Sequence, residues 1–400
     1  MATTASKKSP LIVIFTTVFL DLIGFGIIIP LVGIYGREYG ATTLELATLG
    51  AIYSVMQFFF SPFWGRLSDR YGRRPILLMS LAGSVLSYFL FAFANSIPLL
   101  IFSRAMAGIF AANISTAQAY IADITKPEDR AKGMGLIGAA FGIGFTLGPP
   151  VGGISVSKLG MSAPGIIAGT LCLLNLILAW FRLDESLSPE LRARAMSAET
   201  KRGRLAQYET FLAIQNKPAL LLAIVSTFLA TFAFSNLEQV FSLFIQTKFE
   251  LRTEEAAFKT GMILMWSGIL GAIIQGGLIR RLVPKHGERK LLIIGLFTQA
   301  LAMVLFSQSP TYGSFFITAV PLAIGSGLIN PTLASLVSKG AADHEQGAVI
   351  GLKEGMSSLA RIFGPLSGLL AFGVQASLPF FIGALTVSGL GLVWLNRKSS

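Results

Sequence analysis

The sequence predicts an all-α membrane protein of twelve transmembrane helices in two six-helix bundles related by a pseudo-two-fold axis. Of the 400 residues, 53% are hydrophobic and 13% are charged, whereas soluble domains carry about 25% charged residues. Apolar runs of about 20 residues, the length that crosses a bilayer, recur along the whole chain. In addition, a glycine and proline pattern of the first half returns in the second half.

The apolar runs give the predicted spans in order. The first six are 11–35, 44–65, 75–95, 97–122, 133–156 and 163–182, and the second six are 217–247, 258–282, 290–308, 312–338, 347–374 and 377–396. The polar stretch between the two sets predicts a linker on the membrane surface. We therefore expect an N-terminal bundle (1–182), a cytoplasmic linker (183–216) and a C-terminal bundle (217–400).

The repeated pattern links the fifth span to the eleventh at one constant spacing. The matched residues are Gly135, Gly148, Pro149 and Gly152 in the fifth span, and Gly351, Gly364, Pro365 and Gly368 in the eleventh. Repeated bundles are typical of secondary transporters, which bind substrate near the bilayer midplane between the repeats. The pattern therefore predicts two halves that rock around a central site.

The distribution of basic residues predicts the orientation. The net charge is +12, and most Lys and Arg residues fall in the termini, the linker and the loops on their side. The opposite side has only Arg37, Lys158, Lys248, Arg252 and Lys259. Because cytoplasmic loops carry the excess of basic residues, both termini are expected in the cytoplasm. Scattered charges of this kind do not form a nucleic-acid surface.

The sequence offers little for catalysis or cofactor binding. Cys172 is the only cysteine, and the two histidines, His286 and His344, both fall in loops. A single thiol makes neither a disulfide nor a metal site. The chain also lacks the Gly-x-x-x-x-Gly-Lys-Ser/Thr phosphate loop of ATP-driven pumps. We expect no enzyme activity, no metal and no cofactor.

The segment 65–75 is a basic stretch between the second and third spans. We interpret it as a loop bounded by Gly65 and Gly72, which permit tight turns. Asp69, Arg73 and Asp123 would meet there as a cluster that holds helices together and breaks when they move. The alternative is a solvated positive-inside loop, which explains the arginines only. The candidate gating residues are Gly65, Asp69, Arg70, Gly72, Arg73 and Asp123.

Ionisable residues inside predicted spans are functional candidates, because a charge in the bilayer interior is costly. Asp21 lies near the middle of the first span, and we assign proton coupling to Asp21 and Glu238. The alternatives are a structural hydrogen bond for Asp21 and an outer-loop charge for Glu238. Arg104 and Arg361 are candidates for contact with a substrate, the alternative for Arg361 being an internal ion pair with a carboxylate such as Glu238.

Polar amides inside the spans are expected to line a cavity, because an amide that faces lipid is expensive. Some of them would instead bond helix to helix. Together with the two arginines, the candidate substrate-binding residues are Gln57, Arg104, Asn113, Gln118, Gln275, Gln299, Asn330 and Arg361.

These motifs resemble those of the major facilitator superfamily. The segment 65–75 is similar to the signature loop of the superfamily. The segment 21–26, followed by Pro30, is similar to the first-span motif of the drug–proton antiporters in the superfamily, and the segment 104–108 is similar to the fourth-span motif of these antiporters. The fifth span resembles their antiporter motif, carried here by Gly144, Gly148, Pro149 and Gly152. The segments 68–75, 121–123 and 344–348 resemble the tetracycline–proton antiporter branch in particular.

The resemblance implies roles for the gating residues. Asp69 would meet the start of the eleventh helix, where the helix N-terminus favours a carboxylate, and Arg73 would pair with Asp123. Together these contacts would close the cytoplasmic side of an outward-facing state.

Three positions depart from the tetracycline branch. Its acid in the third span falls on Ser87, its histidine in the eighth span on Gly271 and its acid in the ninth span on Gln299. In that branch these residues serve metal–tetracycline recognition and proton coupling. The departures argue against metal–tetracycline as the substrate and leave proton coupling to Asp21, with Glu238 as a second site.

We therefore expect a proton-coupled antiporter that exports small amphiphilic compounds by alternating access. The alternative is an organic anion or lipid transporter of the same superfamily that works as a facilitator or symporter. The expected partners are a small-molecule substrate, protons and the lipid bilayer of a bacterial inner membrane, in which the protein would be a monomer.

Overall fold

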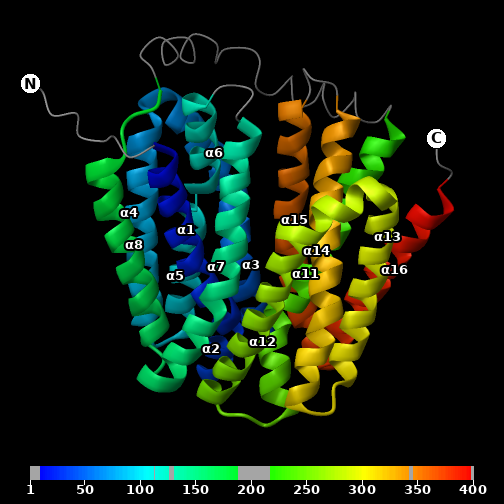
Figure 1. Cartoon of the computed structure of the whole chain (residues 1–400). Helices are drawn as coiled ribbons and strands as arrows, with labels where there is room; N and C mark the ends of the chain where they lie inside the picture. Colours follow the sequence, from blue (N-terminus) through cyan, green and yellow to red (C-terminus); the bar gives the residue numbers. More distant parts are fainter. Residues whose placement is uncertain (1–9, 112, 126–129, 188–216, 342–345, 398–400) are drawn as a thin grey trace, which may run out of the picture.

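The regular structure of the described residues is entirely helical. The computed structural model describes residues 10–111, 113–125, 130–187, 217–341 and 346–397 (Figure 1). The N-terminal half contains α1 (Pro10–Ile28), η1 (Ile29–Leu31), α2 (Val32–Glu38), α3 (Thr43–Tyr71), α4 (Arg73–Ala92), α5 (Ile97–Ile109), α6 (Asn113–Ile124), α7 (Arg130–Leu159) and α8 (Ala163–Arg182). The C-terminal half contains α11 (Pro218–Lys248), α12 (Thr253–Ile273), η3 (Ile274–Leu278), α13 (Ile279–Gln308), α14 (Tyr312–Gly340), α15 (Gln346–Val374) and α16 (Leu378–Asn396).

The outer surface of the molecule is apolar in the way that lipid requires. Within the described ranges, ten helices are long and apolar enough to cross a membrane, and α5 is a shorter apolar helix. Large apolar side chains are exposed along them, including Phe59, Phe181, Ile317 and Leu385. A soluble protein rarely exposes apolar patches of this extent, so the helices are built for a bilayer.

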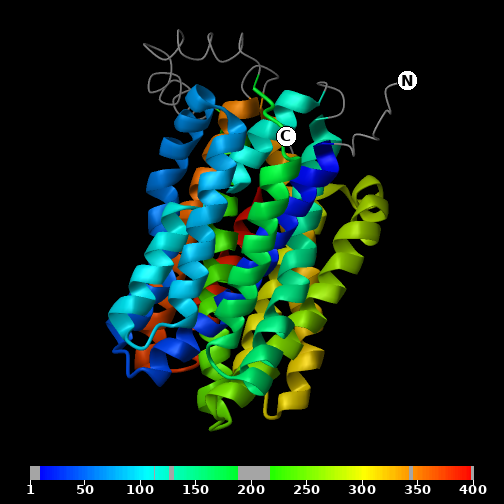
Figure 2. The same ribbon diagram turned by 90° about the vertical axis from the view of Figure 1, so that its left-hand side faces the viewer.

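Each half has its own buried core. One apolar cluster runs through residues 14–183, with Ala256 and Ala257 as its only members from the C-terminal half. The other runs through residues 220–394, with Ala47 as its only member from the N-terminal half. The halves stand side by side, with both chain ends at one face, which we call the terminal face; it is at the top in both views (Figures 1 and 2).

Contacts between the halves gather toward the opposite face. There the Arg37 guanidinium donates a hydrogen bond to the Thr247 hydroxyl, and the Thr253 hydroxyl donates one to the Glu38 carboxylate. Farther in, α3 packs on α15, where a Cβ added at Gly50 would lie 3.1 Å from the Cβ of Pro365. The halves are therefore joined where α2, α3 and α7 of the N-terminal half meet α11, α12 and α15 of the C-terminal half.

The segment predicted as a loop at 65–75 is mostly helical. Helix α3 continues through Gly65 and Asp69 to Tyr71, and the only break is Gly72, with φ of 109°. No residue between Gly65 and Tyr71 breaks a helix, and Arg70 in the last turn suits the negative end of the helix dipole. Only Gly72 needs the conformational freedom of glycine, so the prediction of a loop was wrong for 65–71.

One further boundary differs from the predicted spans, and one agrees with them. The fourth span, predicted as 97–122, turns after Ile109, and side chains of other helices satisfy the freed carbonyls: Trp64 Nε1 donates to the Ile109 oxygen at 2.6 Å, and the Ser80 hydroxyl donates to the Phe110 oxygen. The turn predicted between 282 and 290 is confirmed, because Gly287, with φ of 72° and ψ of 158°, separates two helices within Ile279–Gln308. The break after Ile109, by contrast, depends on local backbone needs that apolar runs do not reveal.

Candidate functional site

A charged cavity lies between the two halves. The empty space between its lining side chains, which includes a part open to solvent, is about 1000 Å³. Helices α1, α3, α4, α5 and α7 and the 3-10 turn η1 line it from the N-terminal half, and α11 and α15 line it from the C-terminal half. Its lining residues are Asp21, Leu22, Phe25, Ile29, Gly50, Tyr53, Ser54, Gln57, Ser84, Tyr88, Arg104, Ala107, Ala111, Phe145, Ser235, Glu238, Gln239, Arg361 and Pro365.

The N-terminal wall carries Asp21 of α1 and Arg104 of α5. Arg104 is only 4% exposed, its guanidinium carbon lies 4.9 Å from the centre of the Tyr53 ring, and its Nε has no hydrogen-bond partner. A cation over an aromatic face is stabilised by the ring quadrupole. The unpartnered Nε leaves one hydrogen-bond donor of a cavity-lining residue unused.

The C-terminal wall carries Glu238 of α11 and Arg361 of α15. Glu238 lies ten residues before the end of α11 and lines the cavity, which places it within the helix rather than in an outer loop. Within the described ranges, neither Glu238 nor Arg361 has an ion pair within 4.0 Å. Both residues line the same cavity, so they share the site without a closed pair.

The predicted polar residues divide between the cavity and other places. Gln57 lines the cavity beside the two arginines, and the side chain of Asn113 lies outside the described residues. The remaining amides are not in the lining. Gln118 is partly buried in α6, Gln275 is exposed in η3, Asn330 is exposed in α14, and Gln299 is buried in α13 against Gly325 of α14.

The glycines of α7 set the position of the helix that carries Asp21. A Cβ added at Gly144 would lie 2.9 Å from the Cβ of Leu22, and one at Gly148 would lie 2.5 Å from the carbonyl carbon of Gly26. Gly152 approaches Ile27 in the same way. Small residues at this spacing let two helix backbones approach closely, so α7 supports α1 directly behind the cavity.

The other side of α7 meets α12 of the C-terminal half. A Cβ at Gly261 would lie 2.7 Å from the Pro149 oxygen, and one at Gly268 would lie 2.9 Å from the Cα of Thr146. Despite Pro149 and Pro150, α7 is continuous from Arg130 to Leu159. The motif helix is therefore packed between α1 of its own half and α12 of the other.

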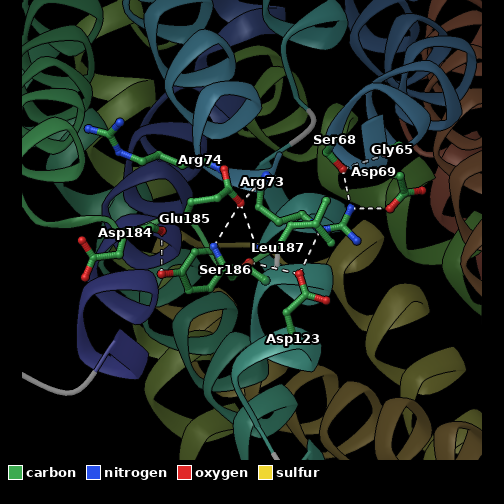
Figure 3. A network of polar contacts seen from close by, with 11 residues as sticks. Gly65, Ser68, Asp69, Arg73, Arg74, Asp123, Asp184, Glu185, Ser186 and Leu187 are labelled. Carbon is green, nitrogen blue, oxygen red and sulfur yellow. Dashed lines mark hydrogen bonds and ion pairs between the residues drawn. The ribbon is translucent and has the colours of Figure 1, made fainter. Parts of the chain in front are cut away.

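A polar network lies at the terminal face, and Figure 3 shows the Arg73 side chain pointing toward the carboxylates of Asp69 and Asp123. Its Nη1 lies 2.5 Å from Asp69 and its Nε lies 3.1 Å from Asp123. The same Nη1 donates to Ser68 Oγ at 2.7 Å. Asp69 is half exposed, and within the described residues it bonds to Arg73 and makes no bond to α15. Arg70 is exposed at the end of α3.

Sequence reasoning missed Glu185, which lies three residues after the end of α8. Its carboxylate accepts hydrogen bonds from the backbone N–H groups of Arg73 and Arg74 at the start of α4, and of Ser186 and Leu187. The Ser186 hydroxyl donates to Asp123 at 3.0 Å. The start of the linker is thus tied to the network (Figure 3). The available signal was an acid placed just after a basic helix end.

Several lining residues were also missed by sequence reasoning. Tyr53 lies one helical turn before Gln57, so the period of the helix places both on one face. Its ring centre lies 4.9 Å from that of Phe25, and the ring centres of Phe25 and Phe145 lie 5.9 Å apart. These rings give the cavity an aromatic wall next to its charges. The spacing of Tyr53 could have found it, whereas the rings of α1 and α7 needed the fold.

Two helical halves around a charged central cavity, in a chain of membrane-spanning helices, define a membrane transporter rather than an enzyme. The chain belongs to the Major Facilitator Superfamily, whose family model matches residues 14–365 and 280–400. This confirms the superfamily that the motifs predicted. The protein is therefore an integral membrane protein of this class.

The relatives include proteins named for drug resistance. Multidrug resistance protein 2 of Bacillus subtilis (strain 168) is 31% identical over 397 residues, which cover 98% of this chain and 97% of that protein. Tetracycline resistance protein, class C, of Escherichia coli is 33% identical over 387 residues, 94% of each chain. Both kinds of relative agree with the branch that the motifs resemble.

Among solved structures, the crystal structure of the human organic anion transporter MFSD10 has a TM-score of 0.68 at 26% identity, covering 98% of this chain and 99% of that one. The nucleoside transporter NupG has a TM-score of 0.77 at 12% identity, covering 98% of this chain and all of that one. At that identity the second likeness concerns the fold alone.

Proposed function

We propose that the protein is a proton-coupled antiporter that exports small amphiphilic compounds across a bacterial inner membrane. The observation that carries the proposal is the cavity, in which each half supplies one carboxylate and one arginine: Asp21 and Arg104 from one, Glu238 and Arg361 from the other. A carboxylate in a membrane interior is suited to bind a proton and a substrate in turn, which couples the movement of one to that of the other. The relatives named for multidrug and tetracycline resistance support export as the direction.

The proposed mechanism is alternating access. With the termini in the cytoplasm, as the positive-inside rule favours, the contacts of Arg37 with Thr247 and of Glu38 with Thr253 close the outer face. The outward-facing state then needs a closure on the cytoplasmic side, for which Asp69, Arg73 and Asp123 are the proposed gate. In the outward-facing state the Asp69 side chain, which is half exposed here, would contact the start of α15.

Inverted membrane vesicles test the proposal. With an acidic interior, a fluorescent amphiphile should accumulate, and collapsing the pH gradient with a protonophore should release it. Vesicles without the protein are the control. Accumulation that persists after the gradient has collapsed would contradict proton coupling.

A second candidate is an organic anion transporter that works as a facilitator or symporter. The unpartnered Nε of Arg104 and the 26% identity to a human organic anion transporter favour it. In the same vesicles, an anionic dye that equilibrates without a pH gradient, or that moves together with protons, would support this candidate. A lipid transporter remains the weaker variant of it, because the lining combines charges with rings rather than a long apolar groove.

A further inference from the structure

The geometry points to a bipolar subsite in which Glu238 and Arg361 bind the two ends of a zwitterionic aromatic amphiphile, the ligand ammonium at Glu238 and the ligand carboxylate at Arg361. This inference rests on the proposed function and names its substrate class. Both residues line one wall of the cavity, from α11 and α15.

Among the described residues, the two side chains of the subsite do not form an ion pair with each other. An ion pair that served only structure would be closed, yet no contact within 4.0 Å joins Glu238 to Arg361 in the described part of the chain. Each is left with capacity for a charge-assisted hydrogen bond. Such bonds are about twice as strong as neutral ones, so both side chains are ready for a charged ligand.

Charge balance in the closed cavity favours a ligand that carries both charges. A ligand with only a cationic group leaves Arg361 uncompensated, and one with only an anionic group leaves Glu238 uncompensated. Leaving a desolvated charge without its partner is strongly unfavourable. A ligand that carries both charges satisfies both residues, which selects zwitterions over ions of a single sign.

An aromatic surface lines the cavity together with the subsite. The rings of Phe25, Tyr53 and Phe145 form an aromatic wall, and Tyr53 and Arg361 line the same cavity. The charged residues and the aromatic wall therefore bound one common space. An aromatic body next to the two charged groups of a ligand would fill that space.

The subsite also gives a direct route to exchange. A protonated Glu238 carboxyl no longer pairs with an ammonium, so a proton and the ligand ammonium exclude each other at this residue. The other ionisable groups that face the cavity are Asp21 of α1, Tyr53 of α3, Tyr88 of α4 and Arg104 of α5, beside Arg361 of α15. The competition between a proton and the ligand ammonium for Glu238 therefore takes place among charged groups of both halves.

Three probes built on one fluorescent aromatic scaffold test the inference. The first carries a piperazinium and a carboxylate, the second is its methyl ester and keeps only the cation, and the third is its N-acetyl derivative and keeps only the anion. Dissociation constants are measured on the purified full chain in lipid nanodiscs. The zwitterion should bind the wild type at least about tenfold more tightly than either derivative, the loss expected for one charge-assisted hydrogen bond.

Variants assign each end of the ligand. Arg361→Gln should reduce zwitterion binding to the level of the ester without changing ester binding, and Glu238→Gln should do the same with respect to the N-acetyl probe. Lys353→Gln, on α15 and outside the lining, is the matched control and should change none of the three constants. The melting temperature of each ligand-free variant shows that it folds.

Equal affinity of the three probes, binding of none of them, or a uniform loss across all three in Arg361→Gln would overturn the inference. The vesicle assay separates this failure from that of the proposed function. If export depends on the pH gradient but the zwitterion is not preferred, the subsite is wrong and the proposed function stands. If the zwitterion is bound selectively but transport does not depend on the gradient, proton coupling is wrong and the subsite stands.

Discussion

The carboxylate of Glu185 accepts a hydrogen bond from the backbone N–H of Arg73 at 2.8 Å, so a residue near the start of the linker caps the helix that begins at the network arginine. The Arg74 N–H also donates to Glu185, at 3.2 Å. Carboxylates are favoured at helix N-termini, where N–H groups lack intrahelical partners. Gly72 is required beside it, because its φ of 109° is a backbone conformation that other residues rarely adopt.

Replacing Glu185 by alanine should lower the free energy of unfolding by about 1 kcal/mol, the usual value of an N-terminal cap. Asp184→Ala is the matched control, since it removes the same charge one residue away, and the Tyr120 hydroxyl bonds to the Asp184 backbone oxygen. The measurement is unfolding in mixed micelles with increasing denaturing detergent. Equal losses in both variants would mean that net charge, not capping, is responsible.

Arg73→Lys should weaken the terminal-face network although it keeps the charge. One guanidinium serves Asp69, Asp123 and Ser68 at once, and a single ammonium does not reproduce that planar fork. We expect lower stability and slower transport, measured on the same preparations. Arg66→Lys, on the exposed side of α3, is the control and should behave as the wild type. Transport at the wild-type rate by Arg73→Lys would show that the network is not part of the gate.

Gly148→Ala should push α1 away from α7 and so disturb Asp21 from behind. The added Cβ would lie 2.5 Å from the Gly26 carbonyl carbon, and overpacking of this kind costs about 1–3 kcal/mol. Gly142→Ala in the same helix meets no heavy atom within 4 Å and should be neutral. Melting temperature and transport rate are the measurements. A neutral Gly148→Ala would show that the close helix approach is not needed.

A disulfide between residues 43 and 373 should lock the halves together at the opposite face. A Cβ at Gly373 would lie 3.4 Å from the Cβ of Thr43, close to the separation of about 3.5–4.5 Å in disulfides. Cys172 is buried and is the only native cysteine, so it does not compete. The pair Thr43→Cys and Gly373→Cys should lose transport on oxidation and regain it on reduction, whereas transport by the oxidised form would exclude movement at this contact.

Much of the fold follows from the period and length of the apolar runs. The span predicted at 163–182 coincides with α8, and the charges predicted at Asp21 and Arg104 line the cavity. The ends of the helices were harder to predict from the sequence. Helix α3, for example, ends where Gly72 permits a turn and not where the apolar run ends. An end of this kind depends on backbone conformation and not on hydropathy.

Cavity-lining residues could be predicted where a charged residue interrupts an apolar run. They could not be predicted where the rotation of a helix about its axis decides which face lines the cavity. Gln57 and Gln299 are both amides in apolar spans, yet only Gln57 lines the cavity, and Gln299 is buried against α14. Which face of a helix turns inward depends on close approaches such as that of Gly325 to Gln299. The role of Glu185 likewise depends on a contact between segments far apart in sequence.

The central claim is that Asp21 couples substrate movement to protons, and Asp21→Asn tests it most directly. In proteoliposomes, the wild type should accumulate a fluorescent amphiphile against its gradient when a pH gradient is imposed. Asp21→Asn should lose that accumulation but retain exchange of labelled for unlabelled substrate without a pH gradient, which shows an intact cavity. Full gradient-driven accumulation by Asp21→Asn would contradict the account.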